Sequence, residues 1–458
     1  MIRGQYDIVL AGFVALCLVF GGASQGGFLS NFALQVIAIG MISTGFALRT
    51  GPWAGGEEKL LRWCAYLIIA IAVLQFLPLP FGLWSALPGR SSIANGLQLI
   101  GADGGWMLYS LAPFDSLATM AWLLPAVATA FCASLLLDLK ANRLAIIVVA
   151  IAIISIPLAA LQVASEGASS WYFYRISSFG QGNGFFANGN HQATFLAMAI
   201  VLLSALYANH LKENRQTGMG VRLVFGAALV VLLAGVMLAG SLAGIGLLVL
   251  IAAPCVLIMT PHIALPSTRV LAAYGLGALV FVAIMASLGL ALGSSALESS
   301  GPMSRIGIST QTLALAFSNL PFGSGLGTFE AMYRGAEDET AVTTTFINHA
   351  HNDYVELLLE TGLLGGAAMV LFALWWVKRS LRIWTEDRDN HFALAGTIMI
   401  AVVLIHSVVD YPLRTVAVSA LFALGFALMV RPASLWLRPN SHKAKADPGR
   451  RKKKKITF

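Results

Sequence analysis

Long apolar runs recur along this chain, and they limit its possible folds more than any other feature. Hydrophobic residues make up 58% of the 458 residues and charged residues 11%, whereas soluble domains average about 25% charged residues. Apolar runs of about 18–22 residues are long enough to cross a bilayer as helices. We therefore expect an all-α, polytopic membrane protein with about twelve transmembrane helices, at residues 6–22, 28–48, 61–81, 117–137, 144–163, 191–208, 222–240, 243–260, 270–293, 354–377, 392–412 and 413–430.

Positive charge is distributed unevenly among the segments that join these runs. Twelve spans put 24 of the 29 lysines and arginines on the side of both termini and five on the opposite side. The positive-inside rule makes the richer side cytoplasmic. We expect the basic tail, residues 431–458, to be a disordered cytoplasmic segment near anionic lipid, and we do not expect it to bind nucleic acid.

The opposite, outer side receives three substantial loops, at about residues 82–116, 164–190 and 294–353. The cytoplasmic loops are short and connective, so we expect the functional residues on the outer face. The four cysteines lie inside apolar runs and lack metal-ligand spacing. We therefore expect neither a disulfide nor a zinc site.

The stretch from Asn348 to Asp353 concentrates polar side chains ahead of a long apolar run. It contains His349 and His351, and either Asn352 or Asp353 is a suitable N-cap for the helix that follows. The positive end of that helix disfavours a protonated His351. We expect a neutral histidine that can act as a base.

Two pairs of residues with helical spacing follow this stretch. Glu356 and Glu360 place two carboxylates four residues apart on one face. Gly362 and Gly366 form a pair of small residues that allows close approach of a neighbouring helix.

The loop at residues 164–190 carries Arg175 directly after an aromatic run that is typical of a membrane interface. Glycine and asparagine residues follow, and Asn190 or Gly189 is a suitable N-cap for the next span, ahead of His191. The alternative interpretation is an interfacial turn with an incidental arginine.

The loop at residues 294–353 carries Arg305 at the start of a helix-like run that ends at Asn319. The glycines of residues 321–328 match neither a Walker loop nor a dinucleotide-binding motif, so we expect no nucleotide there. The acidic residues 337–339 indicate a solvated turn; a metal site is the alternative, although the spacing of its ligands is not diagnostic.

His406, Asp410 and Arg414 are spaced one helical turn apart near the outer end of the span predicted at residues 392–412. Ionisable side chains at membrane depth cost several kcal/mol unless they are paired or face a cavity. Two interpretations stay open: a paired network that holds the bundle together, or a direct part in a central site.

Together these outer residues point to chemistry on a phosphate. Two guanidiniums, of Arg175 and Arg305, are suited to binding phosphate, and a neutral His351 is suited to taking a proton from a hydroxyl. An apolar bundle around them favours a membrane-anchored phosphate or diphosphate that is attacked by an alcohol. We expect no metal and no cofactor, because arginine can stabilise the charge on the leaving group.

The segment His351-Asn352, nine residues, Gly362, two residues, Gly365 resembles the signature of the bacterial O-antigen ligase family, which includes related O-antigen and exopolysaccharide polymerases. Other parts of the chain also resemble that family: Arg175, Asn190-His191, Arg305 and the segment from His406 to Asp410. One departure is Leu242, which stands where many relatives have an arginine, so a phosphate contact at that turn is in doubt.

This resemblance implies a GT-C-like helical bundle in the bacterial inner membrane, with its active site on the periplasmic side. Such enzymes transfer a glycan from undecaprenyl diphosphate to an acceptor hydroxyl with inversion and without a metal. The acceptor is lipid A-core for a ligase and a growing polysaccharide for a polymerase. The resemblance implies that Arg175, Arg305 and His351 are catalytic and that the substrate-binding residues are Asn352, Asp353, Asn190, His191, His349, His406, Asp410 and Arg414.

We divide the chain into N-terminal transmembrane helices at residues 1–163, a catalytic region at 164–430 and the basic tail. Two other classes of protein are alternatives. A proton-coupled transporter or polysaccharide flippase would use His406 and Asp410 in a pathway, but we find no internal sequence repeat. A non-catalytic membrane scaffold would explain the spans but not the polar residues around His351.

Overall fold

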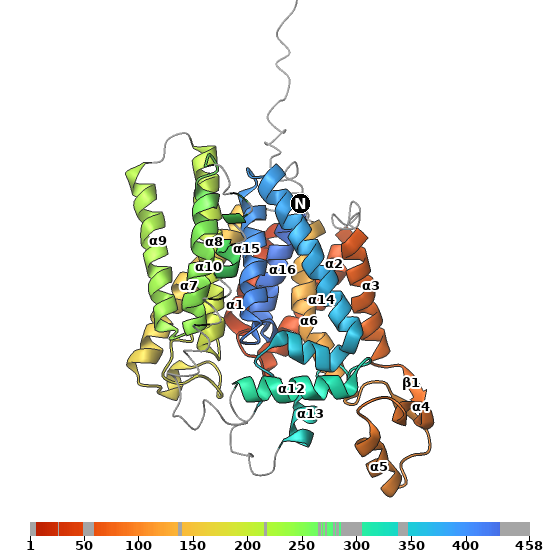
Figure 1. Cartoon of the computed structure of the whole chain (residues 1–458). Coiled ribbons are helices and arrows are strands. Elements are labelled where there is room, and N and C mark those ends of the chain that lie inside the picture. The colour runs from red at the N-terminus through yellow and green to blue at the C-terminus, as the bar shows by residue number, and fades with distance from the viewer. Residues whose placement is uncertain are drawn as a thin grey trace, which may run out of the picture.

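The computed structural model describes residues 6–25, 27–48, 59–135, 140–214, 218–263, 305–337 and 347–430, with scattered residues between 267 and 284. Long helices run side by side, and short helices and a two-stranded sheet lie at one end of them (Figure 1). The elements in chain order are α1 (Tyr6–Phe20), α2 (Leu29–Leu48), α3 (Lys59–Leu74), β1 (Pro78–Pro80), α4 (Phe81–Ser85), α5 (Ser91–Leu99), β2 (Trp106–Leu108), α6 (Pro113–Leu135), α7 (Ala141–Ala164), η2 (Ser169–Trp171), α8 (Gly189–Glu213), α9 (Met219–Leu238), α10 (Leu242–Met259), α12 (Arg305–Asn319), α13 (Phe329–Ala336), α14 (Asp353–Glu386), α15 (His391–His406), η3 (Pro412–Arg414) and α16 (Val416–Val430).

The described helices form an all-α, polytopic membrane protein, but they do not support the expected number of twelve spans. Seven are long and apolar enough to cross a membrane: α2, α6, α7, α8, α9, α10 and α14. The helices α1, α3, α15 and α16 have only 15 or 16 residues. At 1.5 Å per residue they reach about 24 Å, less than the about 30 Å of a hydrocarbon core. The span expected at 270–293 lies largely outside the described residues.

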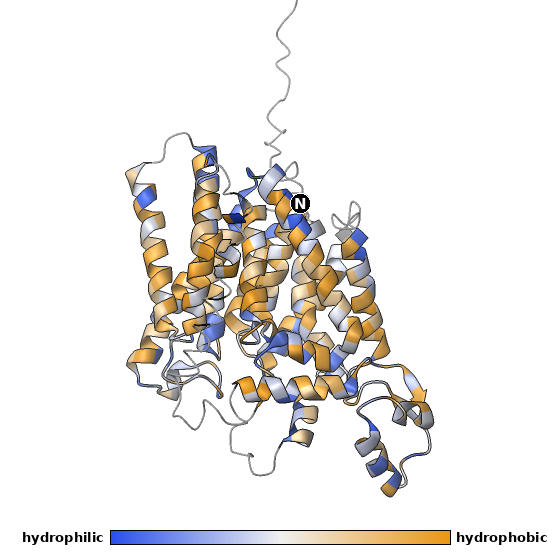
Figure 2. Ribbon diagram, in the orientation of Figure 1, coloured by the Kyte–Doolittle hydropathy of each residue, from blue (hydrophilic) through white to orange (hydrophobic). Residues whose placement is uncertain are grey.

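Helix α8 is the centre of the bundle. In the most apolar 18-residue stretch of α8, 78% of the helix is buried within the protein. The corresponding share for α9, at the periphery, is 17%. Helices α7, α9, α10 and α15 pack against α8, and α16 continues the core by packing against α15, α6 and α1. A helix that is apolar on every side is stable when other helices or lipid surround it. The apolar outer faces seen in Figure 2 are suited to contact with lipid.

Segments of the three predicted outer loops lie at the same end of the bundle (Figure 1). One is a small lobe in which β1 pairs antiparallel with β2, Pro78 opposite Leu108. Inside it Arg90, only 1% exposed, stacks on Trp84 and Tyr109 and donates to the Tyr109 carbonyl. Burial lowers the pKa of Arg90 to about 10. This arginine holds the lobe together.

Helix α14 is broken at Gly362, whose φ of 58° is not helical. The break frees the carbonyls of Leu359 and Glu360, which accept from the backbone amides of Ser324 and Gly325 at 2.9 Å each. The span expected at 354–377 lies within α14, which is long and apolar enough to cross a membrane, and the break at Gly362 was not predicted. A Cβ at Gly362 would lie 2.3 Å from the Pro321 carbonyl oxygen, so the close approach is to this loop backbone and not to another helix.

Candidate functional site

Asn352 positions the candidate base, His351. As predicted, Asn352 is the N-cap of α14: its side-chain oxygen accepts from the amides of Tyr354 and Val355, at 3.0 and 3.1 Å. Its side-chain nitrogen donates to the Val408 carbonyl at 2.9 Å. One asparagine therefore joins the start of α14 to the turn after α15.

His351 adopts a left-handed conformation, with φ of 54°, which a residue other than glycine seldom adopts outside functional sites. Burial is the main reason that the pKa of His351 is lowered to about 4, and the charge of Arg305 lowers it further against the opposing effect of Asp410. The imidazole is therefore neutral at pH 7, as expected for a base. Its Nδ1 is buried without a hydrogen-bond partner among the described residues.

A first group of polar side chains, the Asp410 cluster, consists of Asp410, Asn190, His191, Thr194 and His406. Asn190 donates to Asp410 Oδ2 at 2.7 Å, and the Nε2 atoms of His191 and His406 each lie 3.9 Å from an Asp410 oxygen. Thr194 Oγ1 lies 2.5 Å from His406 Nδ1. Helices α8 and α15 thus bring these residues together around one carboxylate.

The electrostatics of the cluster keep Asp410 ionised. Burial alone would raise the pKa of this carboxyl, but His191, Arg305 and His406 lower it well below its usual range. Several nitrogens of the cluster have no hydrogen-bond partner within the described part of the chain: both of His191 and Nε2 of His406. Buried polar atoms without a partner are costly, and they are found where a substrate or a water completes the site.

The structure corrects the expected cap of α8. The N-cap is Asn188, whose side chain accepts from the Asn190 amide at 2.8 Å, and not Asn190 or Gly189. The physical reason is that Asn188 has the extended backbone that a cap needs, whereas Gly189 is already helical. The Asn190 side chain is therefore available to Asp410.

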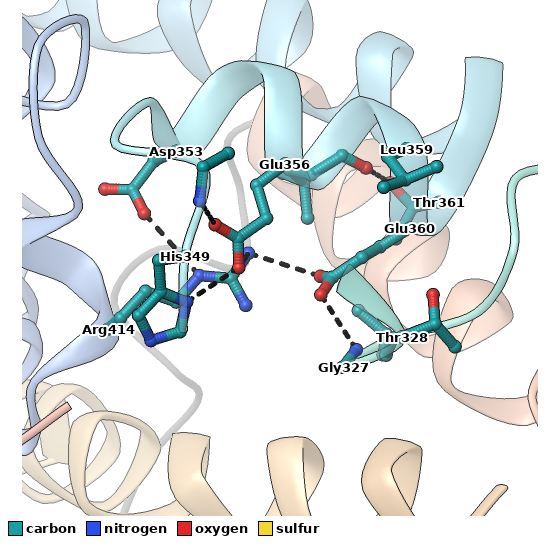
Figure 3. Close-up of polar contacts among 12 residues, drawn as sticks. Gly327, Thr328, His349, Asp353, Glu356, Leu359, Glu360, Thr361 and Arg414 are labelled. Carbon is teal, nitrogen blue, oxygen red and sulfur yellow. Dashed lines mark hydrogen bonds and ion pairs between the residues drawn. The ribbon is translucent and has the colours of Figure 1, made fainter. Parts of the chain in front are cut away.

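A second group, the Arg414 cluster, consists of Arg414, Asp353, Glu356, Glu360 and His349 (Figure 3). The guanidinium lies 3.5 Å from Asp353, 3.4 Å from Glu356 and 3.2 Å from Glu360. His349 Nδ1 lies 2.8 Å from Glu356, and the Gly327 amide donates to Glu360 at 3.0 Å. The three carboxylates are at most 7% exposed. Burial lowers the pKa of Arg414, but these carboxylates raise it above its usual value, so the arginine stays charged.

The expected single network of His406, Asp410 and Arg414 was wrong in one respect. Asp410 does lie beside His406, but Arg414 pairs with the carboxylates of α14. Helix α15 ends at His406, and the chain then turns through residues 407–411 into η3. Helical spacing therefore does not apply beyond His406, and the two charges belong to different clusters.

Tyr411 joins the two clusters. The centroid of its ring lies 5.1 Å from that of His191, 4.6 Å from that of His349 and 5.0 Å from that of His351. Burial and the nearby Asp410 raise the pKa of the Tyr411 hydroxyl above its usual value. The tyrosine is therefore a neutral spacer that packs three histidines around one ring.

The two expected phosphate ligands differ in how they relate to the clusters. Arg305, at the start of α12, is exposed, and its charge acts on His351, Asp410 and His406. Arg175 is also exposed, and it has no hydrogen bond or ion pair to any residue that the structure describes. Its neighbour Tyr174 bonds the backbone of Phe20 and Gly22, which ties this loop to the turn after α1. A role for Arg175 stays a prediction.

A cavity of about 380 Å³ opens beside the Arg414 cluster. Glu356, Glu360, His349 and Arg414 line one side of it. The turn after α1, helix α6 and the start of α13 provide the remaining walls. The site therefore consists of polar side chains from widely separated segments, at one end of an apolar bundle.

Comparison with known protein families gives the context of this site. A family model described as O-antigen ligase matches residues 227–370. The chain carries an O-antigen ligase domain. That domain supplies Arg305, His351 and the three carboxylates of α14, whereas Asn190, His191, His406, Asp410 and Arg414 come from outside the matched residues. No curated protein matches the chain.

Sequence reasoning did not assign several residues of the candidate site. Glu356 and Glu360 stand out in the sequence as an i, i+4 pair, but nothing in it connects them with Arg414, more than 50 residues away. Thr194 gave no signal of its own. A tyrosine directly after a buried aspartate, ahead of Pro412, was the only local hint that a turn replaces the helix there.

Proposed function

We propose that this protein is a membrane glycosyltransferase that moves a glycan from undecaprenyl diphosphate to an acceptor hydroxyl. One observation carries the proposal: within the residues that match the O-antigen ligase family, a neutral His351 with a left-handed backbone packs on Tyr411, whose ring also contacts a histidine of each polar cluster. The acceptor is lipid A-core if the enzyme is a ligase and a growing polysaccharide if it is a polymerase.

The chemistry is a single displacement. The acceptor oxygen attacks the anomeric carbon, and the bond from that carbon to the diphosphate oxygen breaks with its electron pair on the diphosphate. The hydroxyl proton passes to a ring nitrogen of the neutral His351. Attack opposite the leaving group inverts the anomeric centre. Positioned bases of this kind contribute about 10²–10⁴ in rate.

Arg305 is placed to bind the diphosphate, because its exposed guanidinium acts electrostatically on His351 and Asp410. Arg175 is proposed as the second phosphate ligand. Asp410 orients Asn190 and His191, and the unpartnered nitrogens of the Asp410 cluster are available to a substrate. Glu356 holds His349 in place, and Arg414 pairs with Asp353 at the start of α14.

We also propose that the protein lies in the bacterial inner membrane with both termini in the cytoplasm. The excess of lysine and arginine on that side supports this orientation. The clusters and the cavity would then face the periplasm, where lipid-linked glycans are joined to their acceptors.

The decisive experiment is transfer in vitro, with the purified protein in lipid nanodiscs, a glycan linked to undecaprenyl diphosphate and an acceptor. We expect His351→Ala to lower the rate by about 10²–10⁴, and Arg305→Ala to raise the KM for the donor. The control is His262→Ala, which removes an exposed histidine after α10. Unchanged turnover in a folded His351→Ala variant would refute the assignment of the base.

Gene deletion distinguishes the two acceptors. A ligase mutant makes surface polysaccharide but leaves the lipopolysaccharide core uncapped on gels. A polymerase mutant leaves cores that carry a single repeat. A deletion that changes neither the length of the surface polysaccharide nor the capping of the lipopolysaccharide core contradicts both forms of the proposal.

A further inference from the structure

The cavity beside the Arg414 cluster is separate from the face of His351 that the transfer reaction uses. His349 forms part of its wall, and the Tyr411 ring packs against both His349 and His351. Its volume of about 380 Å³ is at the lower end of the range for ligand pockets, about 300–1,000 Å³. The space suits a compact ligand one aromatic ring away from the base.

The lining of the cavity is polar and partly unused. Thr119, Gln25, Asn348 and Glu330 contribute a hydroxyl, two amides and a carboxylate. Within the described residues, Thr119 and Gln25 make no side-chain hydrogen bond, and Glu330 has only an ion pair with Arg334 at 3.3 Å. Groups that both donate and accept, set around a small volume, match a ligand that carries several hydroxyls.

The charge of the lining selects among such ligands. Three carboxylates, of Glu330, Glu356 and Glu360, face the cavity together with a single guanidinium, that of Arg414. Arg414 already pairs with Glu356, Glu360 and Asp353. No cation of the described lining is therefore free to pair with an anionic ligand, which would be repelled at short range in a partly buried site.

We propose that this cavity binds an uncharged sugar residue of the acceptor and excludes a phosphorylated one. The inference rests on the proposed glycan transfer, because it places the acceptor sugar next to the base. Thr119 and Gln25 hydrogen-bond the sugar hydroxyls, and Glu330 at the mouth repels phosphate.

Binding is tested without turnover. Saturation-transfer NMR on the full protein in nanodiscs compares D-glucose, D-galactose and D-mannose with glucose 6-phosphate. We expect at least one neutral hexose to bind and glucose 6-phosphate to bind at least tenfold more weakly. Thr119→Phe, which fills the cavity, should abolish binding. Ala118→Phe, on the exposed face of the same helix, should not.

The outcomes separate the inference from the proposed function. Absence of binding by all three hexoses, binding that survives Thr119→Phe, or equal binding of the phosphate overturns the inference. In the transfer assay, Thr119→Phe should raise the KM for the acceptor and leave the KM for the donor unchanged. If Thr119→Phe transfers glycan normally with an unchanged KM for the acceptor, the cavity is not the acceptor site, and the proposed function is unaffected. Sugar binding without transfer by the wild-type protein refutes the proposed function and leaves the cavity as a sugar site.

Discussion

Replacing Arg414 by methionine tests how the site is held together. The change removes the one guanidinium that faces Asp353, Glu356 and Glu360, while keeping a side chain of similar length. All three carboxylates are at most 7% exposed, so water from the adjoining cavity replaces the lost charge only in part. Breaking one buried ion pair costs about 3–5 kcal/mol, because it leaves an uncompensated charge.

The hydrogen bonds that survive limit this cost. Asp353 still accepts from Ser407, Glu356 from the Ala350 amide and Glu360 from the Gly327 amide. We therefore expect Arg414→Met to lower the free energy of unfolding by about 3–4 kcal/mol, a large fraction of the about 5–15 kcal/mol of a typical protein.

The assay is reversible unfolding in mixed micelles, with a double-mutant cycle. Glu360→Gln alone should destabilise the protein, since it weakens the contact with Arg414. In the Arg414→Met background the same change removes an unpaired charge, so the two effects should couple by about 0.5–3 kcal/mol. Arg382→Met is the control: its pair with Glu386, at 3.6 Å, is exposed on both sides and should contribute about 0–1 kcal/mol.

Two results would refute this reasoning. One is an Arg414→Met variant as stable as the Arg382→Met control. The other is strict additivity of Arg414→Met and Glu360→Gln, which would mean that the two side chains act independently.

Two further predictions concern the base and the break in α14. Because the pKa of His351 is lowered to about 4, the imidazole stays neutral as pH falls through 6.5 and becomes protonated only near pH 4. The acid limb of kcat/KM that depends on His351 should therefore lie near pH 4; half-loss near pH 6.5 would contradict it. Gly362→Ala should cost about 1–3 kcal/mol of stability, since alanine disfavours a φ of 58° and its Cβ would meet the Pro321 carbonyl at 2.3 Å. Gly366→Ala is the matched control, because a Cβ there meets only Leu358 at 3.9 Å. Equal losses of stability in the two variants would contradict this prediction.

The parts of the fold that depend on local chemistry could be predicted from the sequence. Asn352 was recognised as a cap, because an asparagine directly before a helix accepts from its first amides. The helix from Arg305 to Asn319 was also recognised from its pattern. The all-α membrane class followed from the apolar runs alone, whereas the number of spans did not, because four helices are shorter than the runs indicated.

The pairing of charges could not be predicted in the same way. Regular spacing suggested that Asp410 and Arg414 belong together, but this inference assumes that the helix continues, and α15 ends at His406. Once the chain turns, the partners of Arg414 are set by the packing of η3 against α14. The sequence does not specify that contact locally. The assignment of Arg175 to the site stays a prediction for the same reason.

The interruption at Gly362 divides α14 into two helical segments with different surroundings. Residues 353–361 are fastened to the 321–325 loop by two backbone hydrogen bonds, and Leu363, at the start of the second half, donates a third to the Pro321 carbonyl. Residues 364–386 continue as the part of α14 suited to cross the bilayer. A change in membrane thickness changes the tilt of a membrane-spanning helix. Because α14 is interrupted at Gly362, such a tilt is not transmitted through a continuous helix to Asp353, Glu356 and Glu360. The protein can thus adapt to the lipid around it while the geometry at its polar end is preserved.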